Sequence, residues 1–282
     1  MTATPSLHSG PSPSSDAIPQ DLLDLIASLS ATARDRVFSL TYGGRKLWIK
    51  RPGVPRLRSS VLMQTGIARV FALPILLPAR QLVGPAGLAQ EASAIRMLSQ
   101  AGFPVPEVVA CTDQYLVLGD AGQALEPLLH ATRDDDKRWR FIASAGTLLT
   151  RLHAAGHWHG GAQIRNFCWQ DGQPGLLDLE DHGLDRMTLA DRQARDLLLF
   201  LYSLTRYDRA PGLPRISAQA AVMIAQASPK SRAALQRLRR RMAWLLALAR
   251  WIAPHAGRDV RQAVAADQAI GRALAQAEAA EN

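Results

Sequence analysis

The segment that most restricts the fold of this chain is residues 159–180. It begins with His159, has Asn166 seven residues later, and then contains two short apolar runs separated by an Asp-Gly pair, the second of which leads to Asp178. Apolar runs on both sides of such a pair predict a short β-hairpin. The segment therefore predicts a loop with a histidine and an amide, followed by a hairpin that ends at a carboxylate.

Hydrophobic periodicity places strands and helices around this segment. Strands are predicted for residues 38–50, as a hairpin around a glycine pair, and for 108–111 and 115–118; helices are predicted for 21–33, 88–100 and 139–155, and for most of the chain after 189. Strands with one helix thus precede a helical half, which predicts an α+β fold with two lobes. The predicted parts are a disordered tail (1–19), a small β-rich N-lobe (20–119, with a basic insertion at about 51–85) and a larger helical C-lobe (120–282).

Three features of the sequence favour a cytoplasmic protein. The first residues are rich in Ser, Pro and Thr and lack the basic and apolar regions of a signal peptide. The two cysteines, Cys111 and Cys168, have no metal-ligand spacing and are predicted to be buried thiols in a reducing compartment. No stretch reaches the roughly 18 uninterrupted apolar residues of a membrane span.

The net charge of +9 is concentrated in two segments. Residues 36–90 contain nine Lys or Arg and no acidic residue, and a second basic cluster occupies residues 230–241. Such segments attract phosphates, nucleic acid or an anionic membrane surface. Because apolar residues interleave the first segment, it is a candidate peripheral membrane element, with a solvated face as the alternative. Residues 242–251 are predicted to be a core helix, with membrane contact as the alternative, and nucleic-acid binding is the least favoured partner.

Four residues in this chain order have the chemistry of a Mg-ATP site. Lys50, at the end of a predicted strand, could contact phosphates, and Glu91, on the next helix, could hold that lysine in an ion pair. Asn166 and Asp178 could supply oxygen ligands to Mg²⁺, a hard cation that prefers carboxylates and carbonyls. Phosphoryl transfer depends mainly on positioning and charge neutralisation, which these residue types provide.

The order His, Asn, Asp at this spacing is that of the protein-kinase pattern. Over residues 38–204 the chain resembles the bacterial lipopolysaccharide-kinase-like family of the protein-kinase-like superfamily, which includes kinases that act on Kdo and heptose sugars. Supporting motifs are Trp48-Ile49-Lys50, Gly102-Phe103-Pro104-Val105-Pro106-Glu107, Leu152-His153-Ala154-Ala155-Gly156, Leu177-Asp178-Leu179-Glu180 and Arg195-Asp196-Leu197. The resemblance implies a two-lobed kinase-like fold and ATP-dependent phosphotransfer, at the inner face of the inner membrane or in the cytoplasm, to a glycolipid, a sugar or another hydroxyl. It also implies that Asp196 braces the catalytic loop.

The chain departs from the pattern at the catalytic base, because Gly161 stands where kinases have an aspartate. Loss of a general base typically costs about 10²- to 10⁴-fold in rate. Candidate substitutes are His159, Glu180 and Asp181, with Gln163 as an orienting group only. The alternative function is that of a pseudokinase, a Mg-ATP-binding scaffold or regulator without phosphotransfer. A second departure is the lack of a Gly-x-Gly-x-x-Gly loop.

Two other interpretations concern polar residues of the loop. His157 and His159 could form a metal pair, but no third ligand has a suitable spacing, and His159 is also predicted to pack beneath the loop as a brace. Arg165 could bind a phosphate or could pair with Asp178 or Asp181.

Overall fold

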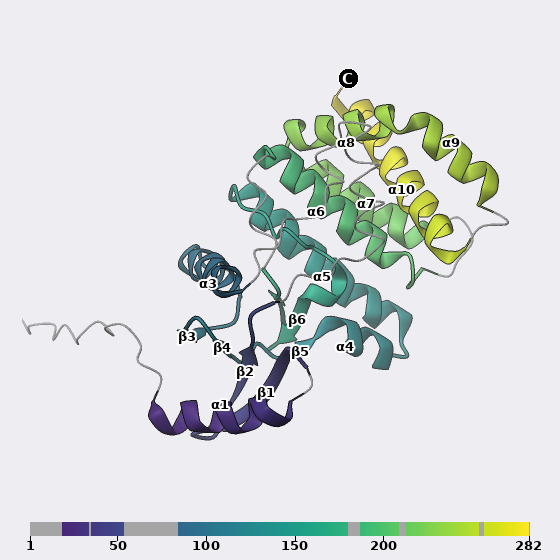
Figure 1. Ribbon diagram of the computed structural model, residues 1–282. Coiled ribbons are helices and arrows are strands. Elements are labelled where there is room, and N and C mark those ends of the chain that lie inside the picture. Colours follow the sequence, from purple (N-terminus) through teal and green to yellow (C-terminus); the bar gives the residue numbers. More distant parts are fainter. Residues whose placement is uncertain are drawn as a thin grey trace, which may run out of the picture.

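The computed structural model describes residues 19–33, 35–53, 84–179, 187–208, 213–253 and 257–281. Within these ranges the protein is α+β, with two small antiparallel sheets and many helices, as the sequence predicts (Figure 1). Some of the predicted parts lie outside the described residues. These are positions 1–18 of the tail, positions 54–83 of the basic insertion, and the residues Glu180 and Asp181.

The described helices and strands follow the predicted order. The strands are β1 (Val37–Tyr42), β2 (Arg45–Lys50), β3 (Val108–Cys111), β4 (Leu116–Gly119), β5 (Gln123–Ala124), β6 (Phe167–Gln170) and β7 (Gln173–Leu176). The helices are α1 (Gln20–Thr32), α3 (Pro85–Gln100), α4 (Leu125–Ala131), α5 (Asp135–Ala154), the 3₁₀ turn η2 (Ile164–Asn166), α6 (Leu189–Leu204), α7 (Pro214–Gln226), α8 (Pro229–Arg241), α9 (Ala243–Ile252) and α10 (Arg258–Glu281). The short strand β5 and helix α4 are the elements that periodicity missed.

The first sheet, in the order β1-β2-β4-β3, lies between two helices (Figure 1). Successive side chains of a strand point to opposite faces of the sheet. Val117 of β4 accordingly packs with Ile26 of α1, whereas its neighbour Leu116 packs with Leu88 and Ala92 of α3. The same alternation decides which face of β2 turns toward α3.

Helix α5 packs between the second sheet and α7. Its predicted stripe is buried, and all four of its members, Ile142, Ala145, Leu149 and Leu152, are in the main core. The helix begins where the Asp134 carboxylate accepts hydrogen bonds from the N–H groups of the first turn. The chain then turns away at Gly156, which has φ 81°, and enters the loop that begins with His157.

The second sheet, β5-β6-β7, contains the hairpin predicted from the Asp-Gly pair. Asp171 and Gly172 form its turn with φ values of 50° and 81°, the left-handed conformations that such two-residue turns require. Phe167 of β6 is fully buried against Phe200 of α6. This anchor holds the hairpin on the helical part, so the residues before β6 and after β7 are fixed in place.

The prediction that residues 242–251 form a core helix was wrong. Helix α9 forms there, but none of its side chains that the structure describes is buried, and Trp251 is 78% exposed. Burial requires a partner surface as well as an apolar sequence, and α10 instead packs along α7 while α8 packs on α6. Across the described part of the chain, no helix combines the length and apolarity needed to cross a bilayer.

Candidate functional site

Lys50 lies at the centre of the candidate site. Because side chains alternate along β2, Ile49 packs toward α1 and Lys50 points toward α3. Its Nζ lies 2.8 Å from Glu91 Oε1 and 2.8 Å from Asp178 Oδ1. Lys50 is 6% exposed and Glu91 only 1%. The predicted Lys50–Glu91 ion pair is therefore present, and it joins groups 41 residues apart in the chain.

Asp178 follows β7 in a conformation that is unusual for a residue with a side chain. Its φ is 58°, in the left-handed region that non-glycine residues seldom adopt. Such positions cost of order 1–3 kcal/mol and are concentrated at functional sites. The backbone here turns the carboxylate onto Lys50, yet the side chain keeps 47% of its surface exposed. Asp178 therefore contacts Lys50 and still has surface available for a ligand.

The charges around Asp178 keep it ionised. Partial desolvation acts to raise its pKa, but the charge and hydrogen bond of Lys50, together with the more distant Arg36, hold the pKa below its ordinary value. At neutral pH the site thus presents a carboxylate and an ammonium group side by side.

The loop between α5 and β6 is held from below by Asp196 of α6. This carboxylate is fully buried and accepts hydrogen bonds from the backbone N–H of His159 at 2.6 Å and of Gly160 at 2.9 Å. His153 Nε2 lies 3.3 Å from it. These contacts confirm the bracing role that the resemblance implied for Asp196.

His159 is a second internal support of the loop. It is fully buried, and its Nδ1 accepts the Gly161 N–H at 3.3 Å, so the proton is on Nε2, which donates to the Asn166 carbonyl oxygen at 3.3 Å. Burial lowers the pKa of His159, against the opposing charge of Asp196, and keeps the ring neutral. With both ring nitrogens on backbone groups, His159 positions the loop, which is the brace interpretation of this residue.

Asn166 and Asp178 are joined through the backbone. Leu177 N–H donates to the Asn166 carbonyl oxygen at 2.9 Å, which places the residue after β7 beside the residue before β6. The Asn166 amide nitrogen donates to the Gly161 carbonyl oxygen at 2.8 Å. That bond fixes the orientation of the amide, so the amide oxygen is the atom that can bind a cation.

The other predicted residues take less central positions. Arg165 is exposed on η2 and is not paired with Asp178. Its alternative partner Asp181, like the base roles of Glu180 and Asp181, falls outside the described residues. Gln163 is half-buried and its carbonyl accepts the Asn166 N–H. His157 packs edge-on against Phe103, and no group of three or more His, Cys, Asp and Glu among the described residues could hold a metal.

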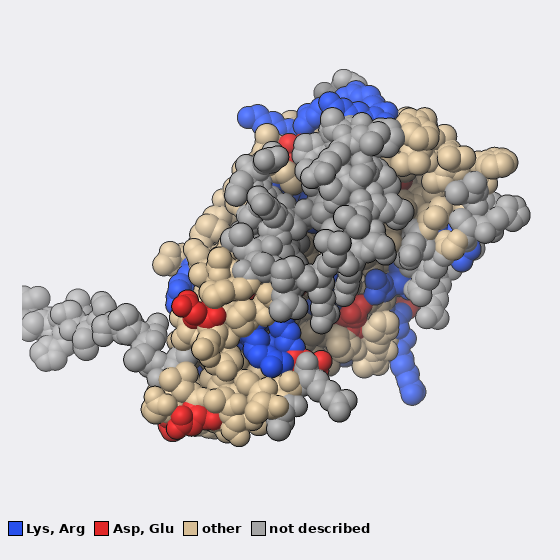
Figure 2. All heavy atoms as spheres, in the orientation of Figure 1, with Lys and Arg blue, Asp and Glu red and all other residues tan. Residues whose placement is uncertain are grey.

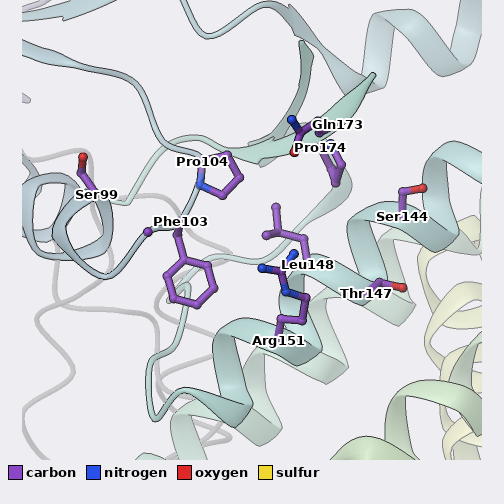
Figure 3. Close-up of a pocket in the computed structure, with 10 residues that line it drawn as sticks. Ser99, Phe103, Pro104, Ser144, Thr147, Leu148, Arg151, Gln173 and Pro174 are labelled. Atoms are coloured by element: carbon purple, nitrogen blue, oxygen red, sulfur yellow. The ribbon is translucent and has the colours of Figure 1, made fainter. Parts of the chain in front are cut away.

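A surface pocket lies elsewhere. It has a volume of about 540 Å³ and is formed by the end of α3 and the residues after it, the middle of α5 and the start of β7 (Figure 3). Phe103, Leu148 and Arg151 line it, and none of Lys50, Glu91 and Asp178 does. Its position excludes it as part of the site around Lys50.

Two contributors to the site occur in the motifs of the resemblance, but the sequence assigned neither of them a role in the site. Arg195, next to Asp196, donates to the Gly160 carbonyl oxygen, and His153 of α5 contacts the Asp196 carboxylate. Both are buried. The available signal was two adjacent charges, Arg195 and Asp196, directly before the apolar run Leu197-Leu198-Leu199-Phe200-Leu201, since buried charges require partners.

Loss of stability below neutral pH is expected from His159. Its pKa is lower in the folded protein than the ordinary 6.5, so below that pH the unfolded chain binds the proton first. The contribution is complete above about pH 6.5 and is lost as the pH falls toward the folded pKa. Urea unfolding between pH 7.5 and pH 5 should therefore show a smaller pH dependence for His159→Gln than for wild type. The exposed His130→Gln is the control, and equal slopes for His159→Gln and wild type would contradict the assignment.

Comparison with known proteins identifies one distant relative. An uncharacterized protein of Haemophilus influenzae (strain ATCC 51907 / DSM 11121 / KW20 / Rd) is 26% identical to this chain over 189 residues, which are 66% of this chain and 70% of that protein. No protein-family model matches the sequence. The function must therefore be argued from the site itself.

The site combines three chemical capacities. The Lys50 ammonium can contact an anion, and the exposed part of Asp178 can bind a cation. The Asn166 amide oxygen can be a further cation ligand, and the Asn166 backbone accepts from Leu177, the neighbour of Asp178. Mg²⁺ typically takes only one or two protein ligands and fills its other positions with water and phosphate oxygens. A donor set of Asp178 and Asn166 beside a lysine fits a magnesium–polyphosphate ligand.

Proposed function

We propose that this protein is an ATP-dependent phosphotransferase with a two-lobed, protein-kinase-like fold, similar to the lipopolysaccharide-kinase-like family. The observation that carries the proposal is the position of Lys50 Nζ, 2.8 Å from both Glu91 and Asp178. These residues come from three segments far apart in the chain, and the kinase pattern assigns a role in nucleotide binding to each of them. The proposed acceptor is a hydroxyl of a glycolipid, a sugar or another small molecule.

Each residue would have a distinct role in the proposed reaction. Lys50 would hold the phosphates of ATP, and Glu91 would keep the lysine in position. Asp178 and Asn166 would provide oxygen ligands for Mg²⁺, which neutralises charge on the phosphates when bound. Asp196 and His159 would keep the loop in the shape that orients Asn166. Catalysis would then rest on positioning and electrostatics.

Gly161 supports a second candidate, a pseudokinase that binds Mg-ATP without transferring phosphate. The position has no side chain to accept a proton from the acceptor, and His159 beneath it is engaged on both ring nitrogens. The two candidates share the nucleotide site and differ in turnover.

Mass-spectrometric detection of ADP and of phosphorylated acceptor distinguishes them. We expect slow ATP-dependent phosphorylation of a hydroxyl acceptor by wild type and none by Asp178→Asn, which keeps the shape of the side chain but loses its charge. Asp171→Asn, in the exposed hairpin turn, is the matched control. Stabilisation by ATP with no turnover on sugars, lipids or protein would replace the phosphotransferase with the scaffold.

Introducing a carboxylate at position 161 should accelerate the proposed reaction. Gly161→Asp is expected to be at least tenfold faster than Gly161→Asn, because a positioned general base contributes about 10²- to 10⁴-fold. Asparagine has the same size without the basic oxygen, so the pair isolates proton transfer. Gly161 is not among the described glycines with a positive φ, so its backbone conformation suits a residue with a side chain. Gly161 is buried, so the comparison is between two variants that place a side chain of the same size in the same space. Equal rates of the two variants, both folded by thermal melting, would contradict a base role at this position.

A further inference from the structure

Helix α9 presents a largely exposed apolar face. Trp244, Leu248 and Trp251 are 56%, 46% and 78% exposed. Their spacing of four and three residues puts them on one side of the helix. Large apolar side chains gathered on a surface mark a contact site for another molecule or for a membrane.

The sequence around α9 is strongly basic. Residues 209–258 contain ten Lys or Arg and no Asp or Glu. The ten are Arg209, Arg215, Lys230, Arg232, Arg237, Arg239, Arg240, Arg241, Arg250 and Arg258. Figure 2 shows Lys and Arg side chains gathered along the edge formed by α8, beside the uncharged surface over α9 (labelled in Figure 1). The apolar face thus borders a positive field.

A buried carboxylate fixes α9 relative to its neighbours. Asp267 of α10 accepts from Arg239 of α8 at 2.7 Å and from Arg250 of α9 at 3.0 Å. Its side chain is only 7% exposed. Arg239 and Arg250 are therefore neutralised inside the helix cluster, and Arg215 and Arg237 pair with Asp136 and Asp191. The side chains of Arg240 and Arg241, at the end of α8, are exposed next to the first residues of α9.

We propose that α9 and the last turn of α8 dock the protein on an anionic lipid bilayer. Tryptophans on the exposed face of an apolar helix suit the interface between headgroups and acyl chains, and neighbouring arginines attract anionic headgroups. A second copy of the chain is a poorer occupant, because a twofold interface would bring the same basic segments together. The docking is independent of the proposed phosphotransfer and is measurable without ATP.

Vesicle flotation of the full chain tests the proposal. The vesicles contain about one part phosphatidylglycerol to two parts phosphatidylcholine, at low salt and at about 0.5 M NaCl. We expect binding at low salt and weaker binding at high salt. The double variant Trp244→Ser, Trp251→Ser should bind at least tenfold more weakly, because each tryptophan loses apolar burial in the interface. Arg240→Gln with Arg241→Gln should lose about fivefold for each arginine.

Two controls separate α9 from a general surface effect. Val222→Ser removes an apolar side chain that is 52% exposed on α7. Arg133→Gln with Arg140→Gln removes two exposed charges, one just before α5 and one on it. Both should bind like wild type. Absence of wild-type binding at low salt, or equal binding by the tryptophan variant, would overturn the proposal. Wild-type dimers by light scattering that dissociate in the tryptophan variant would instead assign the face to a contact between copies.

Discussion

Replacing Lys50 with alanine is expected to reduce the proposed ATP-dependent turnover at least 100-fold and to remove the stabilisation that ATP binding at the proposed site should give. The lysine supplies the positive charge at the site, and its Nζ is the atom that Glu91 and Asp178 share at 2.8 Å. Electrostatic groups of this kind typically contribute 10²- to 10³-fold each when positioned in a desolvated site. Phosphorylated product by mass spectrometry and thermal melting with and without Mg-ATP measure the two effects.

The same change also disturbs the fold, and this contribution must be separated. Without Lys50, the Glu91 carboxylate, 1% exposed, loses its cation, which costs about 3–5 kcal/mol for a broken buried pair. Adding Glu91→Gln to Lys50→Ala should recover part of this stability and none of the ATP effect. Lys46→Ala, on the same strand with its ammonium over the Trp48 ring, is the exposed control. An ATP-induced melting shift of normal size in Lys50→Ala would refute the assigned nucleotide site.

Replacing Asp196 with alanine is expected to lower the free energy of unfolding by about 3–5 kcal/mol. The change leaves the buried N–H groups of His159 and Gly160 without their acceptor. Desolvation acts to raise the pKa of Asp196, but the hydrogen bond and charge of His153 and the contacts with His159 hold it below its ordinary value. The carboxylate is therefore the species that stabilises the fold at neutral pH, and its contribution is lost as acid protonates it, below about pH 4.

Urea unfolding at pH 7 measures the loss. Asp196→Asn keeps the volume but presents an N–H₂ group to backbone donors, so it should recover only part of the stability. Asp113→Ala removes an exposed carboxylate from the β3–β4 turn and should change stability by less than about 0.5 kcal/mol. A loss for Asp196→Ala no larger than that of Asp113→Ala would show that the loop does not depend on this brace.

Local patterns were sufficient to predict most of the elements. Helix α5 was predicted by its apolar stripe and the β6–β7 hairpin by its Asp-Gly turn, because the periodicity of side chains and the conformation of a tight turn depend on neighbouring residues. Helix α4 and strand β5 were missed, since a 7-residue helix and a 2-residue strand are too short to show a period.

The site was predicted in part. The chain order and the kinase pattern correctly indicated that Lys50 and Glu91 form an ion pair. The contact of Lys50 with Asp178 depends on the left-handed backbone at Asp178, which no local sequence rule predicts for an aspartate. The support from Arg195 and His153 likewise required knowledge of how α5 and α6 pack.

The sequence by itself therefore determined the types of elements, their order and the identity of the residues that could carry charge in a nucleotide site. Tertiary structure decided which of these groups meet: it brought Lys50 to Asp178 across 128 residues, placed His159 beneath the loop with its ring nitrogens occupied, and left α9 on the surface. The physical reason is that propensity and periodicity act over a few residues, whereas burial and ion pairing depend on the surfaces that distant segments present to one another.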